Sequence, residues 1–235
     1  MLNFLGIGAQ KAGTTWLYTM LAQHPQIGFP AGKEVHFWNR AESLDVAWYH
    51  KCFAEGGRNG ALFGEITPAY AILSPERVRR ICDELPSVRL LYLIRNPIER
   101  AWSSALMALG RAEMTIEEAS DQWFIDHFRS RGSLQRGDYE RCIRTWRAVY
   151  PSEQLLVERY ESIATEPRAL LGRVARHLGV DPDAFGCIPE AELKRRVFSG
   201  APHPLRPSLR PALEGLYRDK IRSLCDYLGI DLGWI

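Results

Sequence analysis

A glycine-rich turn between an apolar run and a helical run constrains the fold of this chain more than any other stretch. Residues 3–8 read NFLGIG, which is typical of a buried strand, and a helical pattern over 14–23 follows at once. Gly8 and Gly13 allow the backbone between them to turn sharply. A strand, a tight turn and a helix N-terminus open many α/β domains and present backbone N–H groups to an anion.

The rest of the chain continues to alternate between strand and helix patterns. Further strands are predicted at residues 62–66, 89–94 and 154–158, further helices at 74–85, 97–109, 138–149, 167–178 and 207–228, and a mostly ordered loop at 189–211. This order predicts the α/β class, as a three-layer, P-loop-like fold with a mainly parallel central sheet flanked by helices. A length of 235 residues fits a single domain, 1–235.

Composition narrows the class of protein. The chain is 46% hydrophobic with a net charge of +2, so we expect an ordinary globular core and no nucleic-acid partner. Five widely spaced cysteines without a C-x-x-C pair argue against a disulfide framework or a metal site, and favour a reducing, cytoplasmic location. No stretch approaches the roughly 20 apolar residues of a membrane helix, so we expect no stable membrane insertion. Oligomeric state has no signal in the sequence.

The glycine-rich turn departs from the phosphate loop of nucleoside triphosphatases, which reads G-x-x-x-x-G-K-[ST]. Gly8 and Gly13 have the required spacing and Thr15 fills the Ser/Thr place. Thr14, however, stands where the lysine belongs, and the lysine has moved inside the loop to Lys11. No predicted strand ends in an aspartate that could hold magnesium. An ATP-dependent small-molecule kinase is therefore disfavoured, and it remains one alternative, with a non-catalytic nucleotide-binding module as the other.

The segment QKAGTTW at 10–16 resembles the 5′-phosphosulfate loop of sulfotransferases that use 3′-phosphoadenosine 5′-phosphosulfate (PAPS) and release PAP. That donor has no β- or γ-phosphate, which accounts for the displaced cation. The resemblance implies a catalytic role for Lys11, as a point charge that stabilises the leaving phosphate. The donor-binding residues that it implies in this loop are Gln10, Lys11, Ala12, Gly13, Thr14, Thr15 and Trp16. Trp16 would stack on adenine, with a place in the core as the equal alternative.

A second anion motif follows the strand at 89–94. The stretch LIRNPIERAWSS at 93–104 is similar to the R-[DN]-P-x-x-R-x-x-S pattern that grips the 3′-phosphate in the same enzymes. The resemblance gives that role to Arg95 and Ser103. Arg100 is expected to be structural, paired with Glu99 or another acid.

The candidate base lies in KEVHFW at 33–38. Transfer of a sulfuryl group to a hydroxyl requires a carboxylate or imidazole within hydrogen-bonding reach of that hydroxyl. An extended segment would point Glu34 and His36 to the same side. The segment resembles K-E-x-x-[FY]-F of the heparan-sulfate-type sulfotransferases and their bacterial relatives, and is most similar to the 3-O branch. The resemblance makes Glu34 the base of an in-line transfer, and His36 a substrate-side residue and the rival base.

Two segments depart from the family pattern. GEITPAY at 64–70 resembles E-K-T-P-x-Y, but Ile66 replaces the lysine that contacts an anionic sugar, which argues for a less charged alcohol. RRVFSGAPHP at 195–204 aligns with a loop reading K-G-R-x-x-P that closes over the nucleotide. Ser199, Gly200 and Ala201 occupy the basic positions of that motif, and Arg195 or Arg196 is the candidate substitute. A small molecule, a lipid, a sugar or a carrier-bound intermediate all remain possible acceptors.

Overall fold

The computed structural model describes residues 2–40, 45–54, 61–195 and 203–235. It divides into two compact units, each described here by itself. One comprises Met1–Ile94 with Thr145–Phe198, and the other Arg95–Arg144 with Ser199–Ile235. Helix α7 (Tyr139–Arg147) runs across the division. The single domain predicted over 1–235 stays a prediction.

The first unit is built on a five-stranded sheet with the order β2-β3-β1-β4-β5, in which all neighbours are parallel. Its strands are β1 (Leu2–Gly8), β2 (Ile27–Gly28), β3 (Leu62–Ile66), β4 (Arg89–Ile94) and β5 (Leu155–Arg159). Its helices are α1 (Thr14–Leu21), α2 (Val46–Ala54), α3 (Pro75–Glu84), α8 (Ser162–Thr165), α9 (Pro167–Leu178) and α10 (Glu190–Leu193), with 3₁₀ turns η1 (Pro68–Ile72), η2 (Ser152–Gln154) and η3 (Pro182–Cys187).

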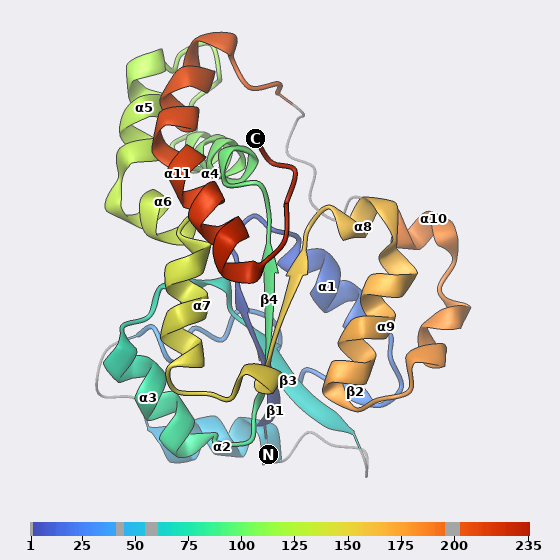
Figure 1. Ribbon diagram of the computed structural model, residues 1–235. Coiled ribbons are helices and arrows are strands. Elements are labelled where there is room, and N and C mark those ends of the chain that lie inside the picture. The colour runs from blue at the N-terminus through green and yellow to red at the C-terminus, as the bar shows by residue number, and fades with distance from the viewer. Residues whose placement is uncertain (1, 41–44, 55–60, 196–202) are drawn as a thin grey trace. The chain divides into compact units, whose positions relative to one another are not determined.

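Figure 1 shows α1, α8 and α9 on one side of the sheet and α3 on the other. The predicted α/β fold with a parallel sheet flanked by helices is therefore confirmed. Strand β1 lies in the middle, where Gly6 pairs with Ile66 of β3 and Gly8 with Tyr92 of β4. The chain therefore leaves β1 between the carboxyl ends of β3 and β4, which is where ligands bind in open parallel sheets.

The centre of the sheet explains the apolar sequence of β1. Phe4, Leu5 and Ile7 have no exposed surface. The ring of Phe4 lies over Gly64 of β3 so closely that a Cβ on Gly64 would be 2.2 Å from it. Because Gly64 has no side chain, the fully buried ring of Phe4 has room on the neighbouring strand at this point.

The second unit consists of helices α4 (Pro97–Arg111), α5 (Asp121–Arg129), α6 (Arg131–Arg136) and α11 (Arg210–Leu228) and the 3₁₀ turn η4 (Pro207–Leu209). Arg100 of α4 is fully buried, and its Nη2 donates to the carbonyl and hydroxyl oxygens of Ser133 at 3.0 and 3.1 Å. Burial and these bonds support the predicted structural role of Arg100, but among the described residues it forms no ion pair with Glu99 or another acid, contrary to the prediction. Glu99 pairs with Arg95 instead, at 3.6 Å.

The predicted loop at 189–211 contains the single helical turn of α10 near its start, and η4 and the first two residues of α11 at its end. Its residues 196–202 lie outside the described ranges. No helix in the described part of the chain combines the length and the apolar character that crossing a bilayer requires.

Candidate functional site

The loop between β1 and α1 is anchored to the sheet at the carboxyl end of β4. The backbone N–H of Ala9 donates to the carbonyl oxygen of Leu93 at 2.7 Å, and that of Ala12 donates back to Ala9 at 3.1 Å. Lys11, at the apex of this turn, is half-buried and has a φ of 69°, in the left-handed region. The turn therefore places the lysine inside the loop, as its position in the sequence indicated.

Gly13 ends the loop, and two features require a glycine at this position. Its φ of 82° is left-handed, and a Cβ on it would lie 2.4 Å from Cδ1 of Ile163 and 3.0 Å from the ring of Tyr160. As the N-cap of α1, Gly13 supplies no side-chain acceptor, and the first helical bond runs from Leu17 N to Gly13 O at 3.0 Å. The N–H groups of 14–16 precede that bond. Ile163 and Tyr160 thus pack directly against Gly13, and the N–H groups at the start of α1 that have no helical acceptor fit a phosphate- or sulfate-type anion.

The other loop residues differ in accessibility. Gln10 and Thr15 are half-buried, whereas Ala12 and Thr14 are buried. Trp16 is only 4% exposed, and its indole N–H donates to the carbonyl oxygen of Leu193 at 2.8 Å. A buried indole that donates to the backbone is typical of a core residue. The structure thus favours the core alternative for Trp16 over stacking on adenine.

The segment that carries the candidate base is strongly curved. Glu34 and His36 have φ values of 63° and 59°, so the extended conformation predicted for this segment is wrong. The predicted proximity is nevertheless confirmed, because Oε2 of Glu34 lies 3.4 Å from Nε2 of His36. The Lys33 ammonium group contacts the other carboxylate oxygen of Glu34. The side chain of Glu34 is 42% exposed, so an acceptor can reach it.

His36 is oriented by a second contact. Its Nδ1 lies 3.1 Å from Oδ1 of Asn39. The ring of His36 therefore lies between two oxygens that only accept, Oδ1 of Asn39 at Nδ1 and the Glu34 carboxylate at Nε2. Each contact is a hydrogen bond only when the ring nitrogen facing that oxygen carries a hydrogen.

A buried carboxylate lies beneath this segment. Glu65 of β3 is fully buried, and its Oε1 accepts from the hydroxyls of Tyr49 at 2.5 Å and Tyr70 at 2.9 Å. Its Oε2 accepts from the hydroxyl of Thr67 at 2.7 Å. Burial raises the pKa of Glu65, and these hydrogen bonds, with one from the Val35 backbone, lower it without cancelling the rise. Residues 64–70 stand out in the sequence through their resemblance to E-K-T-P-x-Y, but that resemblance gives Glu65 no role.

The residues predicted to bind a 3′-phosphate belong to the second unit. Arg95 comes directly before the N-cap of α4, and Ser103 lies on that helix; both are half-buried. Asn96 caps α4 by accepting from Ile98 N at 3.0 Å. Because Lys11 belongs to the first unit, joint binding of one ligand by Lys11 and Arg95 stays a proposal. Arg196, Ser199 and Gly200 lie outside the described residues.

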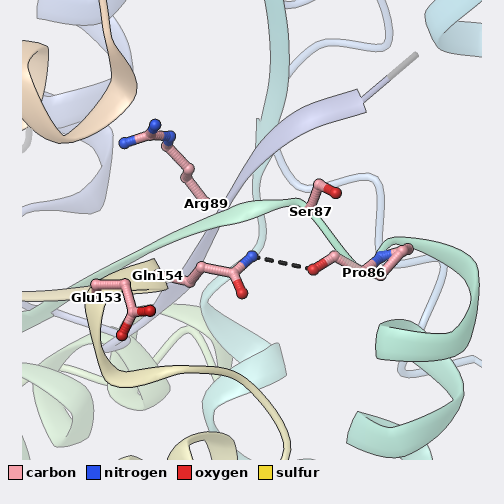
Figure 2. A pocket seen from close by; sticks show the side chains of 5 residues that line it. All are labelled: Pro86, Ser87, Arg89, Glu153 and Gln154. Atoms are coloured by element: carbon pink, nitrogen blue, oxygen red, sulfur yellow. Dashed lines mark hydrogen bonds between the residues drawn. The ribbon is translucent and has the colours of Figure 1, made fainter.

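A pocket of about 400 Å³ lies at the amino ends of β4 and β5, the sheet edge opposite the glycine-rich loop. Figure 2 shows its lining residues, which are Pro86, Ser87, Arg89, Glu153 and Gln154. The amide of Gln154 donates to the carbonyl oxygens of Pro86 and Val88, both at 3.0 Å, and Arg89 donates to that of His177. These polar groups join loops of the fold, and the pocket is separate from the candidate site.

Metal ligands do not gather in the described part of the chain. Among residues 2–40, 45–54, 61–195 and 203–235, no group of three or more histidine, cysteine, aspartate or glutamate side chains could hold a metal ion. No disulfide joins the five cysteines, all of which lie in those ranges.

Comparison with known proteins gives a consistent family. The model of the sulfotransferase domain matches residues 3–195. Mouse heparan sulfate glucosamine 3-O-sulfotransferase 6 is 26% identical over 97% of this chain and 72% of its own length. Mouse heparan sulfate glucosamine 3-O-sulfotransferase 3B1 is 27% identical over 97% of this chain and 63% of its own.

Solved structures agree in fold. A sulfotransferase from Alicyclobacillus acidocaldarius superposes with a TM-score of 0.77 at 25% identity, over 100% of this chain and 98% of that one. Mouse sulfotransferase SULT7A1 complexed with PAP gives a TM-score of 0.60 at 15% identity, over 97% and 88% of the two chains, which shows the fold alone.

Proposed function

The chain belongs to the sulfotransferase domain family, and we propose that it transfers a sulfuryl group from PAPS to a hydroxyl of an acceptor. The observation that carries the proposal is the position of Lys11. It lies within the loop that follows β1, and Thr14 occupies the place of the nucleoside triphosphatase lysine. The donor supplies an activated sulfuryl group whose departure leaves negative charge on a phosphate oxygen.

At that end of the donor, the loop does three things. Its backbone N–H groups bind the phosphosulfate, Thr14 and Thr15 add hydroxyl donors, and the Lys11 ammonium stabilises charge on the departing oxygen. The backbone of the loop is held before any ligand arrives, because Gly13 packs against its neighbours and Ala9 and Ala12 form backbone hydrogen bonds. Loss of one such preorganised donor costs about 3–4 kcal/mol, or roughly 100- to 1000-fold in rate.

At the other end, Arg95 and Ser103 bind the 3′-phosphate. The guanidinium group of Arg95 matches a phosphate with two parallel hydrogen bonds, and the hydroxyl of Ser103, further along the chain on α4, adds a third. Arg196, Ser199 and Gly200 complete this proposal as residues of the loop that closes over the nucleotide.

On the acceptor side, Glu34 takes the proton of the hydroxyl. Its accessible carboxylate and its contact with His36 Nε2, 3.4 Å away, support this role, and His36 remains the rival base. Ile66 is fully buried and packs against Gly6, on which a Cβ would lie only 2.7 Å from the Ile66 side chain. Position 66 therefore offers no cation to an acceptor. We therefore propose a weakly charged alcohol, from a small molecule, a lipid, a sugar or a carrier-bound intermediate.

The test is transfer from radiolabelled PAPS to a panel of neutral and sulfated alcohols, with Glu34→Gln and His36→Gln in parallel. We expect Glu34→Gln to lower turnover roughly 100- to 10,000-fold and to leave PAP affinity unchanged. The larger loss in His36→Gln would transfer the base role to His36. Transfer from ATP with magnesium, and none from PAPS, would contradict the function itself. Binding of PAP with no transfer to any alcohol would instead support the non-catalytic module.

A further inference from the structure

Glu65 has a set of contacts that packing alone does not require. It has no exposed surface, yet four donors converge on its carboxylate: the hydroxyls of Tyr49, Thr67 and Tyr70, and the Val35 backbone. A buried carboxylate is costly unless hydrogen bonds satisfy it, so a position that keeps one has a reason beyond filling space.

The same donors also hold the segment that carries the candidate base. The hydroxyl of Thr67 donates to Glu65 and accepts from the backbone N–H of His36 at 3.4 Å. The hydroxyl of Tyr70 likewise donates to Glu65 and accepts from the backbone N–H of Trp38 at 3.4 Å. Since each hydroxyl has one hydrogen, its donation to Glu65 leaves its lone pairs for the segment.

The segment needs such tethers because its backbone is strained. Glu34 and His36 both have left-handed φ values, at about 1–2 kcal/mol for each non-glycine residue. The backbone N–H of Glu34 donates to the carbonyl oxygen of Ile66 at 3.1 Å, and that of Val35 donates to Glu65 directly. The backbone N–H groups of His36 and Trp38 are linked to Glu65 through one hydroxyl each. The curvature of the segment is therefore maintained from β3 and η1.

We propose that Glu65 is a positioning residue, which sets the direction of the Glu34 carboxylate by fixing the hydroxyls of Thr67 and Tyr70 beneath the 34–38 segment. This inference rests on the proposed function and on Glu34 as the base. Glu65 does not meet the acceptor, because it is fully buried. Its effect is on the geometry of proton removal, for which a misplacement of about 1 Å can cost roughly 100-fold in rate.

Glu65→Gln is the direct perturbation. An amide of the same shape presents N–H groups where the carboxylate accepts, so at least one hydroxyl must turn its hydrogen away and its hold on the segment weakens. Tyr70→Phe removes one relay hydroxyl and leaves the carboxylate in place. Tyr150→Phe is the matched control, since Tyr150 is another buried tyrosine of the same unit, whose hydroxyl donates to Leu85 O at 3.2 Å.

The readout is turnover with radiolabelled PAPS, separated into kcat and KM, with thermal unfolding measured in parallel. We expect Glu65→Gln and Tyr70→Phe to lower kcat about 10- to 100-fold with the KM for the donor unchanged, and Tyr150→Phe to keep the wild-type kcat. The decisive arm is Glu34→Gln combined with Glu65→Gln. If Glu65 acts through Glu34, the double variant is no slower than Glu34→Gln alone.

Multiplied losses in the double variant, or a full kcat in Tyr70→Phe, would overturn the positioning role. Should Glu65→Gln fail to fold, Tyr70→Phe and its combination with Glu34→Gln supply the same comparison. A wild-type chain that transfers no sulfuryl group contradicts the proposed function instead. The positioning claim is then decided by the NMR resonances of the His36 ring. These must shift in Tyr70→Phe and stay in place in Tyr150→Phe, and unchanged resonances in Tyr70→Phe would overturn the claim.

Discussion

Replacement of Gly13 by alanine tests whether the donor loop is built as described. Two costs add at this position. The φ of 82° is left-handed, which costs an alanine about 1–2 kcal/mol. The new Cβ would also lie 2.4 Å from Cδ1 of Ile163 and 3.0 Å from the more rigid ring of Tyr160, and overpacking of this kind costs about 1–3 kcal/mol. We therefore expect Gly13→Ala to lower the free energy of unfolding by about 2–5 kcal/mol.

Gly179 provides the matched control within the same unit. Its φ of 76° is nearly the same, but no atom lies within 4 Å of a Cβ built on it. Gly179→Ala should therefore cost only the backbone contribution of about 1–2 kcal/mol. The difference between the two variants isolates the contact between the loop and the segment after β5.

The assay is equilibrium unfolding in urea, with Ile163→Val added as a second substitution. Valine lacks the Cδ1 atom that the new Cβ meets, so Ile163→Val should recover part of the loss in the Gly13→Ala background. In the wild-type background it should cost about 0.5–1.5 kcal/mol. A Gly13→Ala variant no less stable than Gly179→Ala, or no recovery by Ile163→Val, would refute the described packing of the loop.

Three further predictions concern the site and its surroundings. Lys11→Ala should lower turnover roughly 100- to 1000-fold in the radiolabelled transfer assay, because a preorganised charge is lost; a rate near wild type would contradict its role. Arg95→Lys should weaken PAP binding roughly 10- to 150-fold through loss of a charged hydrogen bond worth about 1.5–3 kcal/mol. Calorimetry checks this against a nucleotide that lacks the 3′-phosphate, whose affinity should not change. Burial, then the charge of Arg100, lowers the pKa of His127 below 6.5, so the folded chain binds this proton less readily than the unfolded chain. The contribution of neutral His127 to the free energy of unfolding is therefore present above pH 6.5 and is lost as the pH falls below it. Urea unfolding should show that His127→Gln loses less stability than the wild-type chain over the same fall in pH.

The strands were predictable because buried parallel strands consist mainly of apolar residues. Residues 62–66 and 89–94 are strands with the predicted bounds, since apolar runs end there at polar or turn-forming residues. Strand β2 has two residues, too few to show any period. Helix α2 mixes charged and aromatic residues, and its start signal is a single residue, Asp45, whose carboxylate accepts from Ala47 N at 2.8 Å.

The candidate site divides in the same way. The position of Lys11 within the turn after β1 was predictable from its spacing to Gly8 and Gly13, because these glycines mark the turn. The left-handed backbone of Glu34 and His36 was not, since non-glycine residues in that region leave no signal in the sequence. The role of Glu65 depends on hydroxyl groups from α2 and η1 that meet only in the folded chain.

The central claim is that the displaced lysine belongs to a phosphosulfate loop. The most direct measurement is calorimetric titration of the intact chain with PAP, and separately with ATP and magnesium. We expect PAP to bind without any divalent cation and more tightly than ATP with magnesium, and Arg95→Lys to weaken this binding. Tighter binding of ATP with magnesium, and no measurable binding of PAP, would contradict it.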